Sequence, residues 1–174
     1  RPNDSQSTSD SPETARLQAL TQGLRISEIM YHPKDPNLEF LELTNIGSGS
    51  LNLKGVRFTG GIECVLPDMA LEPQACVLVV GNREAFAAKH GAEMVIAAEY
   101  QGKLSNGGES IRLTVPQPGN LDIQRFKYDD NWFSSTDGDD HSLIVMDLRA
   151  PVQEWGKLTQ WQPSPSKGGS PGKL

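Results

Sequence analysis

Short runs in which apolar and polar residues alternate are the feature that most limits what this chain can fold into. Residues 24–31 (LRISEIMY) and 38–44 (LEFLELT) both follow this two-residue period. Successive side chains of an extended strand point to opposite faces, so such a run buries one face and leaves the other polar. Pro33 and Pro36 lie between the two runs and cannot donate to a strand ladder. The pattern therefore predicts β-strands separated by turns.

About nine short strands are predicted along the chain. The 17 glycines and 12 prolines punctuate them without a fixed period. One short helix is predicted over residues 83–90, with Asn82 as its N-cap and Gly91 at its end. Many short strands with frequent turns are typical of a β-sandwich or a closed barrel. The predicted strands are residues 24–31, 38–44, 51–58, 62–66, 76–80, 94–98, 109–115, 121–128 and 142–147.

The first 23 residues differ in composition from the rest of the chain. They are rich in Ser, Asp, Asn and Pro, and such a segment cannot bury enough apolar surface to fold. A length of 174 residues favours one domain with tails over two domains. We therefore expect a disordered linker over residues 1–23 and a single β-sandwich domain over residues 24–174. Within the linker, residues 14–21 could form a short helix, although no strong apolar period supports it.

Charge and hydropathy argue against two classes of partner. The formal net charge is −6, and the Lys and Arg residues are scattered along the sequence. A protein that binds a phosphate backbone normally presents a basic face, so no nucleic-acid partner is expected. No run approaches the roughly 20 apolar residues that a membrane-spanning helix needs. We therefore expect no membrane span in this chain.

The two cysteines, Cys64 and Cys76, leave two interpretations open. Both fall on predicted strands that are neighbours along the chain, so they could form a disulfide in an exported protein. They could equally be two small buried hydrophobic residues. Their spacing matches no zinc-binding pattern.

Five aspartates form the segment of the chain that is richest in oxygen ligands. Calcium takes six to eight oxygen ligands, and loops that repeat Asp at short spacing supply them. The segment lacks the later glutamate of an EF-hand loop, and aspartates also commonly cap turns. Ca²⁺ is the one cofactor that the sequence leaves open. The candidate metal ligands are Asp129, Asp130, Asp137, Asp139 and Asp140.

No set of residues predicts catalysis, and no catalytic or cofactor-binding residue is assigned. Glu28, Glu39 and Glu42 could pair across a glycosidic bond, but acidic residues on the outward face of exposed strands are far commoner. The tryptophans Trp132, Trp155 and Trp161 could form an exposed ligand platform, or they could pin the C-terminal segment to the sandwich, which we favour.

Several short motifs, in order along about 150 residues, together resemble a known family. The chain from Leu24 onward is similar to the bacterial lamin tail domain. Many members carry Trp where this chain has Val56. The motifs that carry the resemblance are residues 26–31 (ISEIMY), 39–45 (EFLELTN), 51–58 (LNLKGVRF), 104–109 (LSNGGE), 128–130 (YDD), 137–143 (DGDDHSL) and 169–172 (GSPG).

The resemblance implies an all-β fold, an immunoglobulin-like β-sandwich of about nine short strands with one short helix. Bacterial members are modules of large exported proteins, and the fold carries no assigned catalytic residues. We therefore expect a non-enzymatic interaction or attachment module, extracellular or at the cell surface, whose partner is a protein or an extracellular polymer. The alternative hypothesis is a calcium-dependent adhesion or glycan-binding domain. Fold alone does not define function, so both remain hypotheses at this point.

Overall fold

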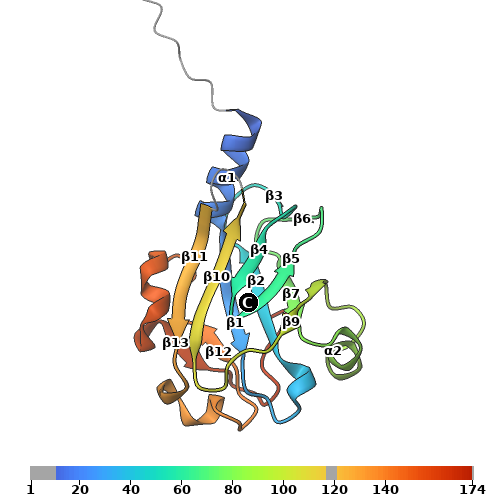
Figure 1. Cartoon of the computed structure of the whole chain (residues 1–174), viewed down its shortest axis with the longest axis vertical. Helices are drawn as coiled ribbons and strands as arrows, with labels where there is room; N and C mark the ends of the chain where they lie inside the picture. Colours follow the sequence, from blue (N-terminus) through green and yellow to red (C-terminus); the bar gives the residue numbers. More distant parts are fainter. Residues whose placement is uncertain (1–10, 117–120, 174) are drawn as a thin grey trace, which may run out of the picture.

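Two β-sheets stacked face to face make up most of the protein. The computed structural model describes residues 11–116 and 121–173. Figure 1 shows strands β4, β5, β10 and β11 in front of β1, β2 and β7, with helix α1 at one end of the stack. The all-β, sandwich-like architecture that the strand pattern predicts is therefore confirmed.

The rear sheet has six strands, in the order β13-β12-β1-β2-β7-β8. Neighbouring strands are antiparallel except β7 and β8, which run parallel. The strands are β1 (Leu24–Met30), β2 (Phe40–Asn45), β7 (Cys76–Val80), β8 (Ile96–Glu99), β12 (Leu143–Val145) and β13 (Trp161–Pro163).

The front sheet has five antiparallel strands, in the order β11-β10-β4-β5-β9. These are β4 (Arg57–Gly60), β5 (Ile62–Val65), β9 (Gln101–Gly102), β10 (Glu109–Val115) and β11 (Leu121–Tyr128). A two-stranded ribbon joins β3 (Leu51–Asn52) to β6 (Ala70–Leu71). The helices are α1 (Pro12–Gly23), α2 (Arg83–His90), and the 3-10 turns η1 (Pro36–Leu38), η2 (Asp130–Trp132), η3 (Ser134–Thr136), η4 (Val152–Gly156) and η5 (Leu158–Gln160).

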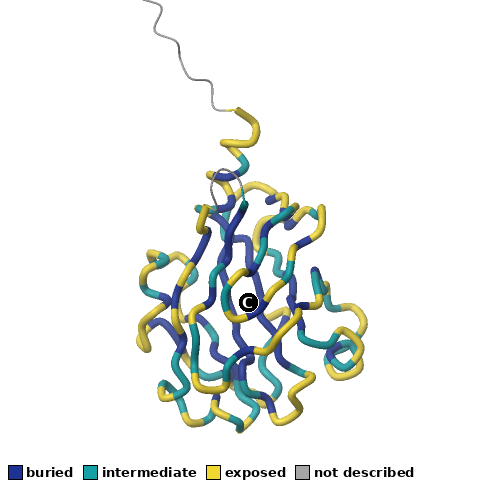
Figure 2. Tube along the Cα trace, viewed as in Figure 1, coloured by how far each residue is buried: buried dark blue, intermediate teal, exposed yellow. Residues whose placement is uncertain are grey.

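The main core lies between the sheets, because each sheet turns its apolar side chains inward. Leu41 and Leu43 of β2 face the gap, as do Ile111 and Leu113 of β10, and all four are fully buried. Figure 2 shows long dark blue stretches in the strands at the centre, alternating with teal and yellow along the front strands, whereas the turns are largely yellow and teal. Burial of a Leu or Ile side chain contributes roughly 1.5–3 kcal/mol, so this alternating pattern stabilises the stack.

The rear sheet has a second, smaller core on its outer face. There α2 lays Phe86 against Phe40 of β2, with ring centroids 5.4 Å apart in an edge-on geometry. Met30, Leu78 and Val80 complete this cluster. As predicted, α2 covers residues 83–90, because the Asn82 side chain accepts the Ala85 N–H at 2.9 Å and caps its first turn.

The second half of the expected linker is helical, which corrects the linker prediction for residues 12–23. Helix α1 starts at Pro12, which fits its first turn, and Ser11 caps it because the Ser11 side chain accepts the Thr14 N–H. Leu17 and Leu20 are buried in the main core. The Arg16 side chain also donates to the Asn52 and Lys54 carbonyls. Two buried leucines are too few to produce a readable apolar period in the sequence. Residues 1–10 lie outside the described part of the chain.

The predicted strand over residues 51–58 is two strands, β3 and β4, which belong to different sheets. A turn closed by the Val56 N–H and the Leu53 carbonyl separates them, and Gly55 takes a positive φ of 74° there. Within the described residues, no helix is both long and apolar enough to cross a membrane.

Candidate functional site

Of the three glutamates that the sequence offered as possible catalytic carboxylates, in the pairs Glu39 with Glu42 or Glu28 with Glu39, the structure brings together Glu28 and Glu42. They are cross-strand partners on the outer face of the rear sheet. A solvated outward face was the commoner expectation for such residues, yet the two side chains are only 2% and 1% exposed. They are covered by residues 168–172, which we call the C-terminal strap.

The strap binds both carboxylates through its backbone. The Ser170 N–H donates to Glu28 Oε1 and the Gly172 N–H donates to Glu42 Oε2, both at 2.7 Å. Hydroxyl groups satisfy the remaining oxygens, because the Ser170 hydroxyl donates to Glu28 Oε2 and the Ser27 hydroxyl donates to Glu42 Oε1. The Ser142 hydroxyl adds a second hydrogen bond to Glu28 Oε1. The pair therefore holds the strap to the sheet.

Burial of this pair changes its acid–base behaviour. Burial raises the pKa of Glu28 to about 7, against hydrogen bonds from Ser142 and Ser170 that favour the charged form. Burial also raises the pKa of Glu42, opposed by hydrogen bonds from Ser27, Gly172 and Cys76. Raised carboxyl pKa values mark functional sites as well as buried structural ones. Here every carboxylate oxygen already accepts a hydrogen bond, which favours the structural role.

Glu39 also has a structural role. It is 4% exposed, and its Oε2 accepts the Tyr100 hydroxyl at 2.8 Å and the Leu104 N–H at 3.1 Å. Tyr100 lies where the chain passes from β8 of the rear sheet to β9 of the front sheet. Glu39 therefore fixes this crossover, and burial raises its pKa.

The five aspartates do not converge on one point. Asp129 accepts the N–H of Asn131 at 2.9 Å and caps η2. Asp137 contacts His32 at 2.6 Å, and Asp140 accepts the Lys34 N–H at 2.6 Å. Asp139 pairs with two lysines, and Asp130 accepts the Asn131 amide. In residues 11–116 and 121–173, no group of three or more His, Cys, Asp or Glu is arranged to hold a metal ion. The calcium hypothesis therefore gains no ligand cluster from the fold.

Cys64 and Cys76 are free thiols. They lie on β5 and β7, which belong to opposite sheets, and the disulfide that the sequence left open does not join them in this structure. Burial raises the pKa of Cys64 to about 11 and that of Cys76 to about 12. Since the thiolate is the reactive form, both thiols stay protonated and are poor nucleophiles near neutral pH.

Two of the tryptophans pin the C-terminal segment, as favoured from the sequence. The Trp155 indole donates to the Ile26 carbonyl at 2.8 Å, and the Trp161 indole donates to the Trp155 carbonyl at 2.8 Å. Both are buried, and Trp132 stacks on Trp161 with ring centroids 6.4 Å apart. These rings do not form an exposed platform.

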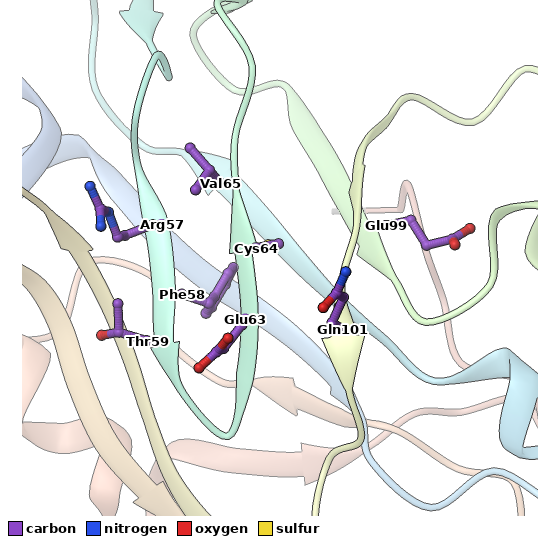
Figure 3. A pocket seen from close by; sticks show the side chains of 8 residues that line it. All are labelled: Arg57, Phe58, Thr59, Glu63, Cys64, Val65, Glu99 and Gln101. Atoms are coloured by element: carbon purple, nitrogen blue, oxygen red, sulfur yellow. The ribbon is translucent and has the colours of Figure 1, made fainter.

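A groove of about 450 Å³ lies on the outer side of β4 and β5. Val65, one of its lining residues, is 60% exposed. Figure 3 shows that the side chains around the groove splay apart, with Arg57 and Glu99 pointing in opposite directions. The Glu99 carboxylate is also engaged, because it accepts the Arg83 N–H of α2 at 2.7 Å. This geometry provides a contact surface and does not assemble an acid, a base and a nucleophile.

The outer face of the front sheet also carries basic residues that the sequence analysis did not single out. Arg57 of β4, Arg112 of β10, and Arg125 and Lys127 of β11 all point away from the core. The signal was present in residues 109–115 and 121–128, where basic residues alternate with apolar ones. It was missed because cations that are distant in sequence looked scattered.

Neither a model of a known protein family nor a curated protein matches this chain.

Proposed function

We propose that this chain is a non-enzymatic interaction module with an immunoglobulin-like, lamin-tail-like sandwich. In this proposal it is one part of a larger exported protein, extracellular or at the cell surface. Its partner is a protein or an extracellular polymer, and no cofactor takes part. The fold-level part of the proposal rests on the ordered motifs of the sequence and on the two stacked, mainly antiparallel sheets.

One observation carries the functional part: the two outer faces of the sandwich are unlike. On the rear sheet, α2 and the C-terminal strap cover the outer face, and the two glutamates beneath the strap accept hydrogen bonds from its backbone. On the front sheet, polar and basic side chains point to solvent, and Val65 is exposed beside them. A bare sheet face next to an exposed apolar residue is a surface suited to a partner.

The first test asks whether the buried carboxylates catalyse anything. The full chain is assayed against panels of glycosides and esters, together with the variants Glu28→Gln and Glu42→Gln. We expect no turnover that depends on either residue. Turnover by the wild-type chain that disappears in one of these variants would overturn the non-enzymatic proposal.

The second test maps the binding face. A photo-crosslinking amino acid replaces Thr59, which is exposed on β4, or Lys89, which is exposed on α2 over the other sheet. In an extract of the source cells and their surroundings, we expect a discrete crosslinked product from position 59 that excess unlabelled chain suppresses. Equal products from both positions, or none from position 59, would count against docking on the front sheet.

A further inference from the structure

Strand alternation gathers four cations on the outer face of the front sheet. Arg57, Arg112, Arg125 and Lys127 are far apart in the sequence, but β4, β10 and β11 are adjacent strands. In register, Arg112 lies opposite Arg125, and Arg57 lies opposite Thr114 of the middle strand. We call these four residues the basic strip. Its sign is the reverse of the chain's net charge of −6.

The basic strip has a cost in the free protein. Like charges directly opposite one another on a sheet are destabilising, and Arg112 and Arg125 are such a pair. Asp122 offsets part of this cost, because its Oδ1 contacts Arg112 Nε at 2.5 Å. Across residues 11–116 and 121–173, neither Arg125 nor Lys127 forms an ion pair. A bound anion would relieve the repulsion that remains.

Arg57 links the basic strip to the groove. Its Nε is buried and has no hydrogen-bond partner in the part of the chain that the structure describes. Arg57 also lines the groove and lies opposite the exposed Val65 in the ladder. The surface therefore offers cations along one side and an apolar contact at the other.

We propose that the basic strip and the groove bind an extended acidic polypeptide segment with an apolar side chain at one end. The proposal rests on the proposed function and names the chemistry of the partner. Arg125 and Lys127 are two residues apart on one strand, so their side chains repeat every ~6.8 Å. Acidic residues at alternate positions of an extended segment repeat at the same spacing. The Asp122–Arg112 contact shows that this face already accepts a carboxylate.

The same charges disfavour a nucleic acid or a sulfated polysaccharide. Four cations against the carboxylates of Asp122 and Glu63 make a short strip, whereas phosphate-backbone binding commonly uses about six to ten contacts. The net negative charge of the whole chain also repels a long polyanion. A short acidic segment matches the charge of the strip without extending beyond it.

The test measures binding of fluorescent peptides to the full chain by polarisation. The probe is a peptide of about ten residues that alternates Glu with Thr and ends in Leu; a matched peptide carries Lys in place of Glu. A heparin oligosaccharide and a single-stranded DNA of similar charge are the competing ligands. We expect saturable binding of the Glu peptide that weakens as salt rises, because exposed charges are screened, and no binding of the Lys peptide.

The variant Arg125→Glu/Lys127→Glu reverses the charge of the two residues that β11 contributes to the basic strip. Its matched control is Lys103→Glu/Arg149→Glu, which changes the net charge equally at exposed positions outside the strip. We expect the strip variant to weaken binding at least about tenfold, equivalent to about 1.4 kcal/mol, and the control to change it less than about twofold. Thermal melts establish that both variants remain folded.

Three outcomes would overturn the proposal: equal losses in the two variants, no saturable binding of the Glu peptide, or tighter binding of the oligosaccharide or DNA than of the Glu peptide. The crosslinking experiment separates this failure from failure of the proposed function. If position 59 crosslinks a partner but the Glu peptide does not bind, only the acidic-segment proposal is refuted. If neither the crosslinking nor the peptide-binding experiment gives the expected result, the proposal that the front sheet is the docking face is refuted as well.

Discussion

Replacing Glu28 with Gln should flatten the dependence of stability on pH. The side chain is 2% exposed, and burial raises its pKa from 4.5 to about 7. Each tenfold change in proton affinity corresponds to about 1.4 kcal/mol, so ionising Glu28 costs the folded state about 3 kcal/mol more than it costs the unfolded chain. This value is an upper bound, because hydrogen bonds adjust when the proton leaves.

The sign follows from proton binding. Between pH 4.5 and about 7, the folded state keeps a proton on Glu28 that the unfolded chain has lost. Stability from this group is therefore fully present below pH 4.5 and is lost as the pH rises through about 7. The wild-type chain should have a lower free energy of unfolding at about pH 8 than at about pH 5. The Gln variant cannot ionise, so it lacks this contribution.

Gln also fits the contacts at position 28. Its carbonyl oxygen can accept from Ser142 and from the Ser170 N–H, and its amide can donate to the Ser170 hydroxyl, which lies 3.3 Å from Oε2. The strap should therefore stay in place.

The assay is urea unfolding at several pH values between about 5 and 8, with tryptophan fluorescence as the signal that monitors unfolding. Glu93→Gln, an exposed carboxylate, serves as the control and should keep the wild-type pH slope. We expect the difference in stability between Glu28→Gln and wild type to shift by about 1–3 kcal/mol in favour of the variant from about pH 5 to about pH 8. Identical slopes for Glu28→Gln and wild type would refute the reasoning.

Three further predictions follow from the same packing. Gly169→Ala should destabilise the protein by about 1–3 kcal/mol, because Gly169 has a φ of 81° and an added Cβ would lie 2.7 Å from Glu28 Oε1. Urea unfolding measures this change. The control is Gly49→Ala, where no atom lies within 4 Å of the added Cβ, and its stability should match that of the wild type. Leu20→Ala should cost about 2–5 kcal/mol, because Leu20 of α1 is fully buried; a change below about 0.5 kcal/mol would mean that α1 is not docked in solution. Adding millimolar Ca²⁺ or a chelator should leave the melting temperature unchanged, because the five aspartates are already engaged separately; a clear rise with Ca²⁺ would restore the calcium hypothesis.

Local patterns in the sequence determined much of the secondary structure. The alternation in residues 24–31 and 109–115 predicts β1 and β10, because the two-residue period is a property of each strand alone. Likewise, Asn82 and Gly91 mark the ends of α2, because capping is satisfied within a few residues. The short strands β9 and β13 left no such trace, since they exist only where a distant strand pairs with them.

Tertiary structure decided the roles of the charged residues. The sequence places Glu28 and Glu42 at outward positions, but only the fold brings the strap across them and turns two expected solvated carboxylates into buried acceptors. The same holds for Arg57, Arg112 and Arg125, which gather on one face through strand order and register. A periodic pattern records which face of a strand a side chain occupies. Which distant segment covers that face, or leaves it bare, depends on long-range pairing that no local pattern encodes.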